Sequence, residues 1–373
     1  MAIQKILFGS PGTGKSYKVR QIAKQELKIT FDTYNNTSQN LVKTVFHPEY
    51  TYSDFMGKLL PLTAGNNIVY KYYPGHFLQA LGKAYRALID GKDNNYLLVI
   101  DELNRGNAAA IFGPIFQLLD RESSGWSSYE VNISEMEFIG LLKAMDYKVE
   151  VLSSNDIKDI KVEGTFFNEY LKNKRDYLDD INTLEVLECI ETFKLKIPPN
   201  LSIIGTINTS DESIYCLDSA FKRRWDWEYI EAPNALDILR NNVPQEIAQI
   251  NIETIWDTEL KWYRCVVGIN EFIKSNYQYI RRIEDKQLGW WFVKPKNQNI
   301  RLEEVRDKVM FYLWDTVFAR DKKPLIKLFE EKLECNTNLA TYSDFANRIN
   351  IFLNYMHNSA PILPELNDDD IMF

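Results

Sequence analysis

The stretch that decides the fold is the octapeptide at residues 9–16, Gly9-Ser10-Pro11-Gly12-Thr13-Gly14-Lys15-Ser16. It has the pattern G-x-x-x-x-G-K-[ST], in which a glycine-rich loop cradles the phosphates of a nucleotide with its backbone N–H groups. An apolar run, Ile3–Phe8, comes before the loop, and a run with helical character, Tyr17–Lys28, comes after it. This order of strand, loop and helix is the context that a phosphate-binding role requires.

The composition of the loop indicates which ligand it would take. Glycines let the backbone curl until successive N–H groups face one anion, and the helix that follows adds its dipole. The ammonium of Lys15 can reach the β- and γ-phosphates, and the hydroxyl of Ser16 can hold Mg²⁺. The alternative is a glycine-rich turn that binds nothing, but strand, loop, lysine and serine in this order favour a nucleotide. We therefore expect the whole loop to bind a nucleoside triphosphate.

Length, composition and charge limit the kind of protein this can be. The chain has 373 residues, of which 45% are hydrophobic and 26% charged, as in a soluble globular protein of about two domains. It has no long uncharged apolar run, so we expect no membrane partner. Four scattered cysteines and three histidines argue against a zinc site and favour a reducing cytoplasm. A net charge of −8 argues against a free-standing nucleic-acid binder.

Alternating strands and helices predict an α/β fold for the first part of the chain. Apolar runs at Ile3–Phe8, Val42–Phe46, Tyr96–Ile100 and Leu201–Thr206 are typical of buried strands. A helix is expected over Asn107–Arg121, where apolar side chains recur on one side. This alternation predicts a parallel sheet flanked by helices.

The chain is expected to divide into two domains. Residues 1–232 would form the large α/β domain, interrupted at about 127–196 by an inserted subdomain. A solvated decoration is the simpler interpretation of that insertion, ahead of a catalytic role. From residue 233 to residue 373 the apolar periodicity is helical, as in Glu259–Ile273 and Glu303–Phe318. We predict that this second part is an all-helical domain.

An acidic pair, Asp101 and Glu102, follows the strand Tyr96–Ile100. Ligands of open α/β sheets bind at the carboxyl ends of the strands, where this pair lies. We expect Asp101 to orient Mg²⁺ together with Ser16, and Glu102 to act as a general base on the attacking water. The alternative is a solvated strand end, which the phosphate loop upstream makes the weaker interpretation.

Three further polar residues complete the candidate site. Asn208 follows the strand Leu201–Thr206, and its amide can hydrogen-bond the attacking water or the γ-phosphate; the alternative is a turn-forming asparagine. Arg223 and Arg224 lie where a guanidinium could meet the phosphate bound by a neighbouring subunit. The alternative for either arginine is pairing with a carboxylate of its own chain, and the sequence does not decide between the two.

Taken in this order, the loop, the acidic pair, the asparagine and the arginines resemble the site of an AAA+ ATPase. Within AAA+ the chain resembles the McrB branch, the GTP-dependent motor subunits of modification-dependent restriction systems. Four stretches carry this resemblance: F-H-P-E-Y-T-Y-S-D-F at residues 46–55, D-E-L-N-R-G-N at 101–107, I-P-P-N-L-S-I-I-G-T-I-N-T at 197–209 and L-D-S-A-F-K-R-R-W at 217–225. Leu288–Phe292 is a weaker match to a motif in the family's lid.

The resemblance implies an AAA+ core with a helical lid, assembled as a hexameric ring that hydrolyses GTP or ATP with Mg²⁺. Lys15, Glu102 and Asn208 of one subunit would act together with Arg223 or Arg224 of the next. An McrC-like nuclease would be the partner that cuts DNA, and the chain would act on DNA only through that complex. No metal-nuclease cluster stands out in this sequence, so we expect that the chain does not cut DNA itself.

Three departures from the family pattern are informative, and one of them is the insertion at about 127–196, which would suit docking of a partner. The signature loop N-T-A-D-R-S reads N-T-S-D-E-S at residues 208–213, so Asp211 keeps an implied nucleotide contact while Glu212 replaces an arginine. This charge reversal weakens any expectation of GTP over ATP. Family members also usually carry a DNA-reading domain before the motor, whereas this motor begins at residue 3. We expect DNA recognition to lie in another subunit or outside this sequence.

Two other functions stay open from the sequence. A MoxR-like AAA+ chaperone shares the fold and every catalytic element, and the stretches at residues 46–55 and 101–107 favour the McrB-like motor over it. A module that uses nucleotide only as an assembly switch would form rings that bind nucleotide and hydrolyse it negligibly. Glu212 keeps that third function open.

Overall fold

The computed structural model describes residues 2–32, 37–64, 67–152, 160–177, 180–209, 215–253, 259–332 and 339–362. The chain divides into two compact units. The first consists of Met1–Leu7, Ser16–Ile207 and Glu212–Glu228, and the second of Phe8–Lys15, Asn208–Asp211 and Tyr229–Phe373. The phosphate loop up to Lys15 therefore belongs with the second unit, whereas Ser16 and the acidic pair belong with the first. The expected division between residues 232 and 233 stays a prediction.

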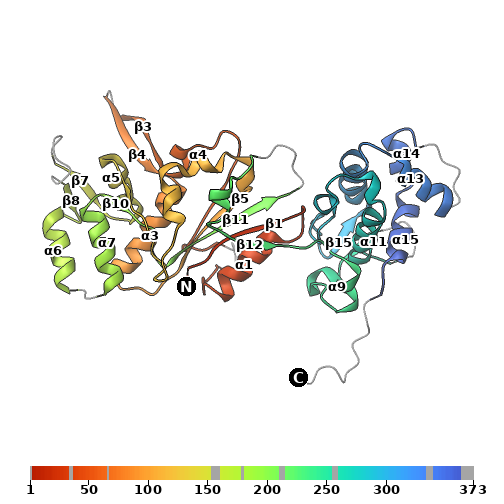
Figure 1. The fold of residues 1–373 in the computed structure, drawn as a ribbon, viewed down its shortest axis with the longest axis horizontal. Coiled ribbons are helices and arrows are strands. Elements are labelled where there is room, and N and C mark those ends of the chain that lie inside the picture. The colour runs from red at the N-terminus through yellow and green to blue at the C-terminus, as the bar shows by residue number, and fades with distance from the viewer. Residues whose placement is uncertain are drawn as a thin grey trace, which may run out of the picture. The chain divides into compact units, whose positions relative to one another are not determined.

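A five-stranded sheet with the strand order β12-β1-β11-β5-β2 forms the centre of the α/β fold (Figure 1). Strand β5 pairs in parallel with β11 on one side and with β2 on the other. Strand β11 ends at Asn208 and lies between the strand that leads into the phosphate loop and the strand that ends at Asp101. The bounds are β1 (Gln4–Gly9), β2 (Leu41–Val45), β5 (Tyr96–Asp101), β11 (Leu201–Asn208) and β12 (Asp226–Tyr229). The predicted parallel α/β fold is confirmed.

One helix follows β1, one precedes β5 and three short helices follow β5. They agree with the predicted alternation, except that the helix expected after β5 is not continuous. They are α1 (Lys15–Gln25), α3 (His76–Ile89), η1 (Leu103–Arg105), α4 (Ala108–Phe112) and the 3₁₀ helix η2 (Gly113–Leu119). The single helix expected over Asn107–Arg121 is therefore divided. Gly113, the first residue of the 3₁₀ segment, has a φ of +49°, and Pro114, which has no N–H to donate, follows it.

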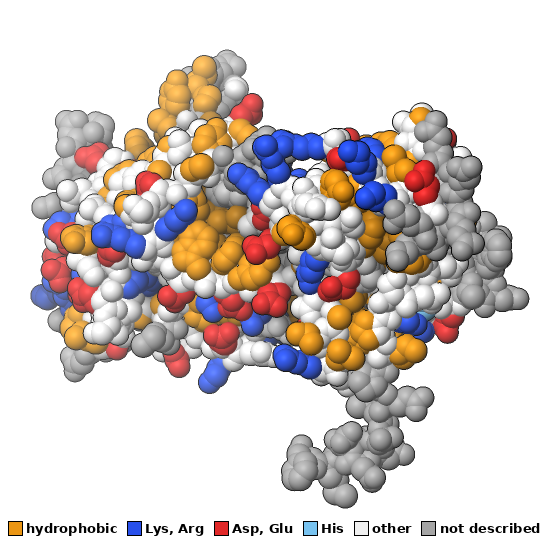
Figure 2. Space-filling view, turned by 45° about the vertical axis from the view of Figure 1, so that its right-hand side comes forward, with side chains coloured by type: hydrophobic (Ala, Val, Ile, Leu, Met, Phe, Trp, Pro, Cys, Tyr) orange, Lys and Arg blue, Asp and Glu red, His pale blue; other side chains and the backbone are white. Residues whose placement is uncertain are grey.

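A two-stranded hairpin of the first unit connects α2 (Tyr52–Phe55) to α3. Strands β3 (Gly57–Ala64) and β4 (Asn67–Pro74) pair antiparallel over their whole length. Tyr72 is buried at the base of this hairpin, but several apolar side chains of the ribbon are exposed, Ile68 at 68%. Figure 2 shows these apolar side chains gathered on the hairpin.

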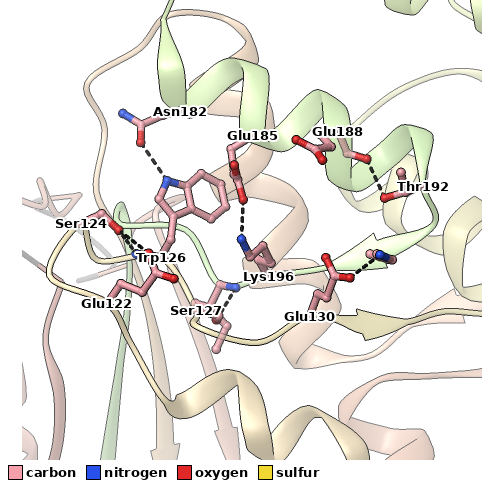
Figure 3. A network of polar contacts seen from close by, with 12 residues as sticks. Glu122, Ser124, Trp126, Ser127, Glu130, Asn182, Glu185, Glu188, Thr192 and Lys196 are labelled. Atoms are coloured by element: carbon pink, nitrogen blue, oxygen red, sulfur yellow. Dashed lines mark hydrogen bonds and ion pairs between the residues drawn. The ribbon is translucent and has the colours of Figure 1, made fainter.

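The stretch expected to be an insertion packs on α3 through its first and last long helices, α5 (Glu135–Ala144) and α7 (Ile181–Glu191). Polar contacts tie its two ends together (Figure 3). The indole N–H of Trp126 donates to Asn182 Oδ1 at 2.9 Å, and the backbone N–H of Ile197 donates to Ser127 Oγ at 2.8 Å. The remaining elements are β6 (Val131–Asn132), β7 (Val149–Val151), β8 (Ile160–Val162), β9 (Thr165–Phe166), α6 (Phe167–Tyr177) and β10 (Lys194–Leu195).

The second unit is mostly helical, and it also contains a three-stranded sheet in the order β14-β13-β15 that the periodicity did not predict. Its core forms where α11 (Trp262–Ser275) packs on α15 (Ile349–Ser359), and a Cβ on Gly268 would lie 2.0 Å from Met356 O. No helix in the described part of the chain combines the length and apolar character needed to cross a membrane.

The other elements of this unit are short. They are α9 (Ala235–Leu239), α10 (Gln245–Ala248), β13 (Asn251–Glu253), β14 (Leu260–Lys261), η3 (Tyr277–Tyr279), η4 (Ile283–Lys286), β15 (Asn299–Arg301), α12 (Leu302–Glu304), η5 (Val305–Met310), η6 (Leu313–Val317), α13 (Lys323–Lys327), η7 (Leu328–Lys332) and α14 (Tyr342–Ala346). The segments η5, η6 and η7 are wound as π-helices. The helix expected over Glu303–Phe318 thus forms with a wider winding.

The side chain of Arg121 joins three backbone carbonyl groups of the first unit by hydrogen bonds. Its guanidinium donates to the carbonyl oxygens of Gly125, Pro198 and Leu201 at 2.8, 3.0 and 2.8 Å. Burial lowers the pKa of this side chain to about 10. We expect Arg121→Met to lower the free energy of unfolding by roughly 3 kcal/mol, because buried carbonyls lose their donors.

Urea unfolding measures this loss as a shift of the midpoint. Arg175→Met is the matched control, because Arg175 makes an exposed ion pair with Glu191 at 2.6 Å, a pair worth about 0–1 kcal/mol. Equal midpoints for the two variants would contradict the assignment of Arg121 as a structural residue.

Candidate functional site

The phosphate loop has the backbone conformation that its glycines permit. Gly12 and Gly14 have φ values of +75° and +98°, which side-chain-bearing residues rarely adopt. Helix α1 begins at Lys15, directly after the loop. The N–H groups of its first turn have no partner within the helix and are suited to an anion.

The loop buries three polar side chains, those of Ser10, Thr13 and Lys15. The ammonium of Lys15 donates to the carbonyl oxygens of Gly9 and Ser10 at 2.9 and 2.8 Å. Ser10 is fully buried, and its Oγ has no hydrogen-bond partner among the described residues. Buried polar atoms rarely stay unsatisfied. A phosphate oxygen would accept a hydrogen bond from this hydroxyl, so the loop fits an anionic ligand.

The acidic pair at the end of β5 is held by a threonine from β11. The hydroxyl of Thr206 donates to Asp101 Oδ1 at 3.0 Å, and the backbone N–H of Glu102 donates to Thr206 Oγ1 at 3.4 Å. Glu102 has a φ of +55°, in the left-handed region. Such a conformation costs a non-glycine residue about 1–3 kcal/mol, and it clusters at functional sites. The strain at Glu102 therefore favours a functional role for this residue.

Ser16 and Asp101, the predicted metal ligands, line one cavity of about 150 Å³ in the first unit. A hydroxyl and a carboxylate are the hard oxygen donors that Mg²⁺ prefers, so this pair fits that ion. Lys43 lines the same cavity, and its Nζ lies 2.7 Å from Asp101 Oδ2. A cation bound by Asp101 would share the carboxylate with this lysine.

Four predicted residues remain: Asn208 and Asp211 of the signature loop, and the arginines Arg223 and Arg224. Asn208 is the last residue of β11, and the N–H of the next residue, Thr209, donates to the carbonyl oxygen of Gly9 in the phosphate loop at 3.3 Å. Asp211 lies outside the described residues, as does Glu212 of the same signature loop. Arg223 and Arg224 follow helix α8 (Ser219–Lys222) and do not line the cavity beside Asp101.

The structure distinguishes the two arginines. Arg224 Nε and Nη2 donate to Asp120 Oδ2 at 2.9 and 2.6 Å, and its guanidinium carbon lies 4.1 Å from the centre of the Phe116 ring. Its side chain is only 9% exposed. Arg223, in contrast, is exposed. Arg224 is therefore engaged within its own subunit, and Arg223 is the arginine accessible to another molecule.

Sequence reasoning missed three contributors to this site. Lys43 is a charged residue among three apolar residues and a threonine in β2, and this is a signal that could have marked it. Thr206 lies in a buried strand and gave no signal. The stretch Leu288–Phe292 was noted only as a motif, yet its backbone donates hydrogen bonds to the carbonyl oxygens of Pro11 and Gly12 at 3.0 and 2.9 Å.

Comparison with known proteins gives two curated relatives. The chain is 29% identical over 347 residues to the YdiS component of the type II restriction enzyme BsuMI from Bacillus subtilis, covering 85% of this chain and 80% of that one. It is 24% identical over 226 residues to the EcoKMcrB subunit of a type IV methyl-directed restriction enzyme from Escherichia coli. That match covers 61% of this chain and 35% of the relative, so the chain corresponds to about a third of that protein.

No protein-family model matches the chain. Among solved structures, a crystal structure from Cytophaga hutchinsonii, named only as a candidate ATPase, aligns over 93% of this chain and 84% of its own. The sequence identity is 12% and the TM-score 0.25, which is too low to add to the conclusions on fold or function.

Proposed function

Because the chain is an McrB-like AAA+ NTPase, we propose that it is the ring-forming motor subunit of a restriction system, and that it hydrolyses GTP or ATP with Mg²⁺. The observation that carries the proposal is that Ser16, which ends a complete phosphate loop, lines the same cavity as Asp101. The strained acidic residue that follows Asp101 supports it. Four cysteines scattered along the sequence, with no C-x-x-C pair, favour the cytoplasm as its compartment.

The proposed roles follow from the chemistry of each side chain. Lys15 and the loop N–H groups bind the β- and γ-phosphates, and the Ser10 hydroxyl adds a donor. Ser16 and Asp101 hold Mg²⁺, which would neutralise the charge that develops on the phosphate oxygens. Glu102 accepts a proton from the attacking water, and Asn208 orients that water. Thr206 keeps Asp101 and the backbone of Glu102 in place.

We assign Arg223 as the arginine that acts on the nucleotide of a neighbouring subunit, because it is exposed and Arg224 is held by Asp120. Arginine fingers contribute roughly 10³–10⁵ to turnover. Arg223→Ala is therefore expected to keep nucleotide binding and to lower kcat at least about 100-fold. Titrating Arg223→Ala subunits into wild type should lower turnover more steeply than dilution alone.

Lys222→Ala is the matched control, because it removes a neighbouring exposed cation, and its turnover should stay within about twofold of wild type, as expected for a surface change. Arg224→Ala should chiefly lower stability, through loss of its bonds to Asp120. If Arg224→Ala blocks turnover at wild-type stability while Arg223→Ala does not, the assignment is reversed.

The proposed partner is an McrC-like nuclease that cuts DNA, driven by this motor. Its test is DNA cleavage by the purified chain, by a purified McrC-like nuclease subunit, and by both together, each with GTP and with ATP. The proposal predicts cleavage only with both proteins and a hydrolysable nucleotide. Cleavage by the chain alone would overturn it. ATP turnover indifferent to nuclease and DNA would favour a MoxR-like chaperone, and negligible turnover with the partner present would favour an assembly switch.

A further inference from the structure

We propose that the stretch Leu288–Phe292, here called the clamp, positions the phosphate loop for nucleotide and senses whether nucleotide is bound. This inference rests on the proposed nucleotide-binding function and adds a positioning device to it. Clamp and loop both belong to the second unit, although they lie more than 270 residues apart in the sequence.

Backbone hydrogen bonds join the clamp to the loop. The N–H of Gly289 donates to the carbonyl oxygen of Pro11 at 3.0 Å, and the N–H of Trp291 donates to that of Gly12 at 2.9 Å. A loop that turns its N–H groups toward an anion must turn its carbonyl groups elsewhere, and those carbonyls need donors where water is excluded. The clamp supplies two such donors, so it favours the loop conformation that receives phosphate.

Glycines make this close approach possible. A Cβ on Gly289 would lie 1.9 Å from the carbonyl carbon of Gly12 and 2.0 Å from the N of Thr13. On the loop side, a Cβ on Gly12 would lie 2.6 Å from the N of Phe292, and one on Gly14 would lie 2.6 Å from Cζ3 of Trp291. Contacts below 3.0 Å are not tolerated by real side chains, so the two backbones need glycine on both sides.

The clamp is itself fixed by two buried side chains of α11. Asn270 is fully buried; its Oδ1 accepts from the N–H of Leu288 at 2.7 Å, and its Nδ2 donates to the carbonyl oxygens of Leu288 and Pro233 at 2.9 and 2.8 Å. The indole N–H of Trp262 donates to the carbonyl oxygen of Trp290 at 2.8 Å. A continuous set of hydrogen bonds thus connects α11 to the phosphate loop.

This connection works in both directions. Loss of the clamp lets the loop leave its anion-binding conformation. This weakens nucleotide binding without altering Glu102 or Asn208, the residues proposed to act on the attacking water. Conversely, phosphate that fixes the loop also fixes the clamp, and the indole of Trp291 against Gly14 reports the change. Asn270 and Gly289 are therefore positioning residues for the nucleotide site.

The first experiment measures the affinity of fluorescent mant-GTP and mant-ATP, with Mg²⁺, for wild type and Gly289→Ala. We expect about 30-fold weaker binding, from the loss of two buried hydrogen bonds, and a kcat at saturating nucleotide within about threefold of wild type. Gly91→Ala is the matched control, because Gly91 also has a positive φ, +64°, but its Cβ would meet nothing within 4 Å. Its affinity should equal that of wild type.

Two further variants keep the proposal testable if Gly289→Ala does not fold. Asn270→Asp retains the acceptor for Leu288 N–H and loses both donors, and we expect about fivefold to tenfold weaker nucleotide binding. Trp291→Phe should abolish the change in tryptophan fluorescence that nucleotide produces in wild type. Trp227→Phe, in the first unit, should leave that change in place.

The outcomes separate the clamp from the proposed function. If wild type binds neither mant-nucleotide, the proposed function fails. If wild type binds nucleotide and both Gly289→Ala and Asn270→Asp bind it with unchanged affinity, the positioning role of the clamp is contradicted. The proposed function then still stands. A fluorescence change that persists in Trp291→Phe would overturn the sensing role.

Discussion

Lys15→Ala will lower the affinity for nucleoside triphosphate by at least about 100-fold and will abolish hydrolysis. The Lys15 ammonium now donates two hydrogen bonds to its own loop, and we propose that it turns to the phosphates when nucleotide binds. A hydrogen bond to a charged group contributes about 1.5–3 kcal/mol, and two such bonds correspond to roughly 10²–10⁴ in affinity. Isothermal titration with GTP and with ATP, each with Mg²⁺, measures this loss.

Lys18→Ala is the matched control for that prediction. Lys18 is also on α1, but its Nζ lies 3.3 Å from Glu228, in an ion pair of the first unit. Its affinity for nucleotide should stay within about twofold of wild type, as expected for a surface pair. Tight nucleotide binding by Lys15→Ala would place the phosphates elsewhere and refute the phosphate-loop assignment.

Glu102→Gln will keep nucleotide binding and lower kcat by roughly 10²–10⁴, the usual contribution of a general base. Glutamine has nearly the same shape and hydrogen-bonding reach, but its amide cannot accept a proton at neutral pH. The left-handed backbone conformation at this position should be unaffected. Glutamate and glutamine have the same branching at Cβ, so this conformation costs both residues about the same free energy. Single-turnover hydrolysis, with bound nucleotide measured in parallel, separates the chemical step from binding.

Glu122→Gln provides the control for the second prediction. Glu122 is exposed on the loop after η2, so this change should leave turnover within about twofold. Turnover at the wild-type rate by Glu102→Gln would show that another group activates the water.

The fold was predictable where burial leaves a pattern in the sequence. Residues 97–100 of β5 and 201–207 of β11 are continuously buried, and their apolar runs predicted the central parallel strands that the pairing confirms. The helix over Asn107–Arg121 was predicted too long, because apolar periodicity continues through Gly113 and Pro114 although the backbone changes winding there.

The candidate site was predictable only where it is local in the chain. The phosphate loop is one octapeptide, and the acidic pair directly follows an apolar run. Lys43 lies 58 positions before Asp101 (101 − 43 = 58), and Thr206 lies 105 positions after it. A charged residue in β2 marks Lys43 as unusual, but no pattern along the chain shows that either residue contacts Asp101. The difference between Arg223 and Arg224 likewise depends on Asp120, which a one-dimensional motif does not include.

The central claim is that this chain hydrolyses nucleoside triphosphate at a site that a second subunit completes. The most direct test is steady-state phosphate release from GTP and from ATP, with Mg²⁺, across a range of protein concentrations, with Glu102→Gln as the blank. We predict release from at least one nucleotide, with a specific rate that rises as subunits associate. Release no greater than the blank at every concentration, or a specific rate independent of concentration and assembly, would contradict the claim.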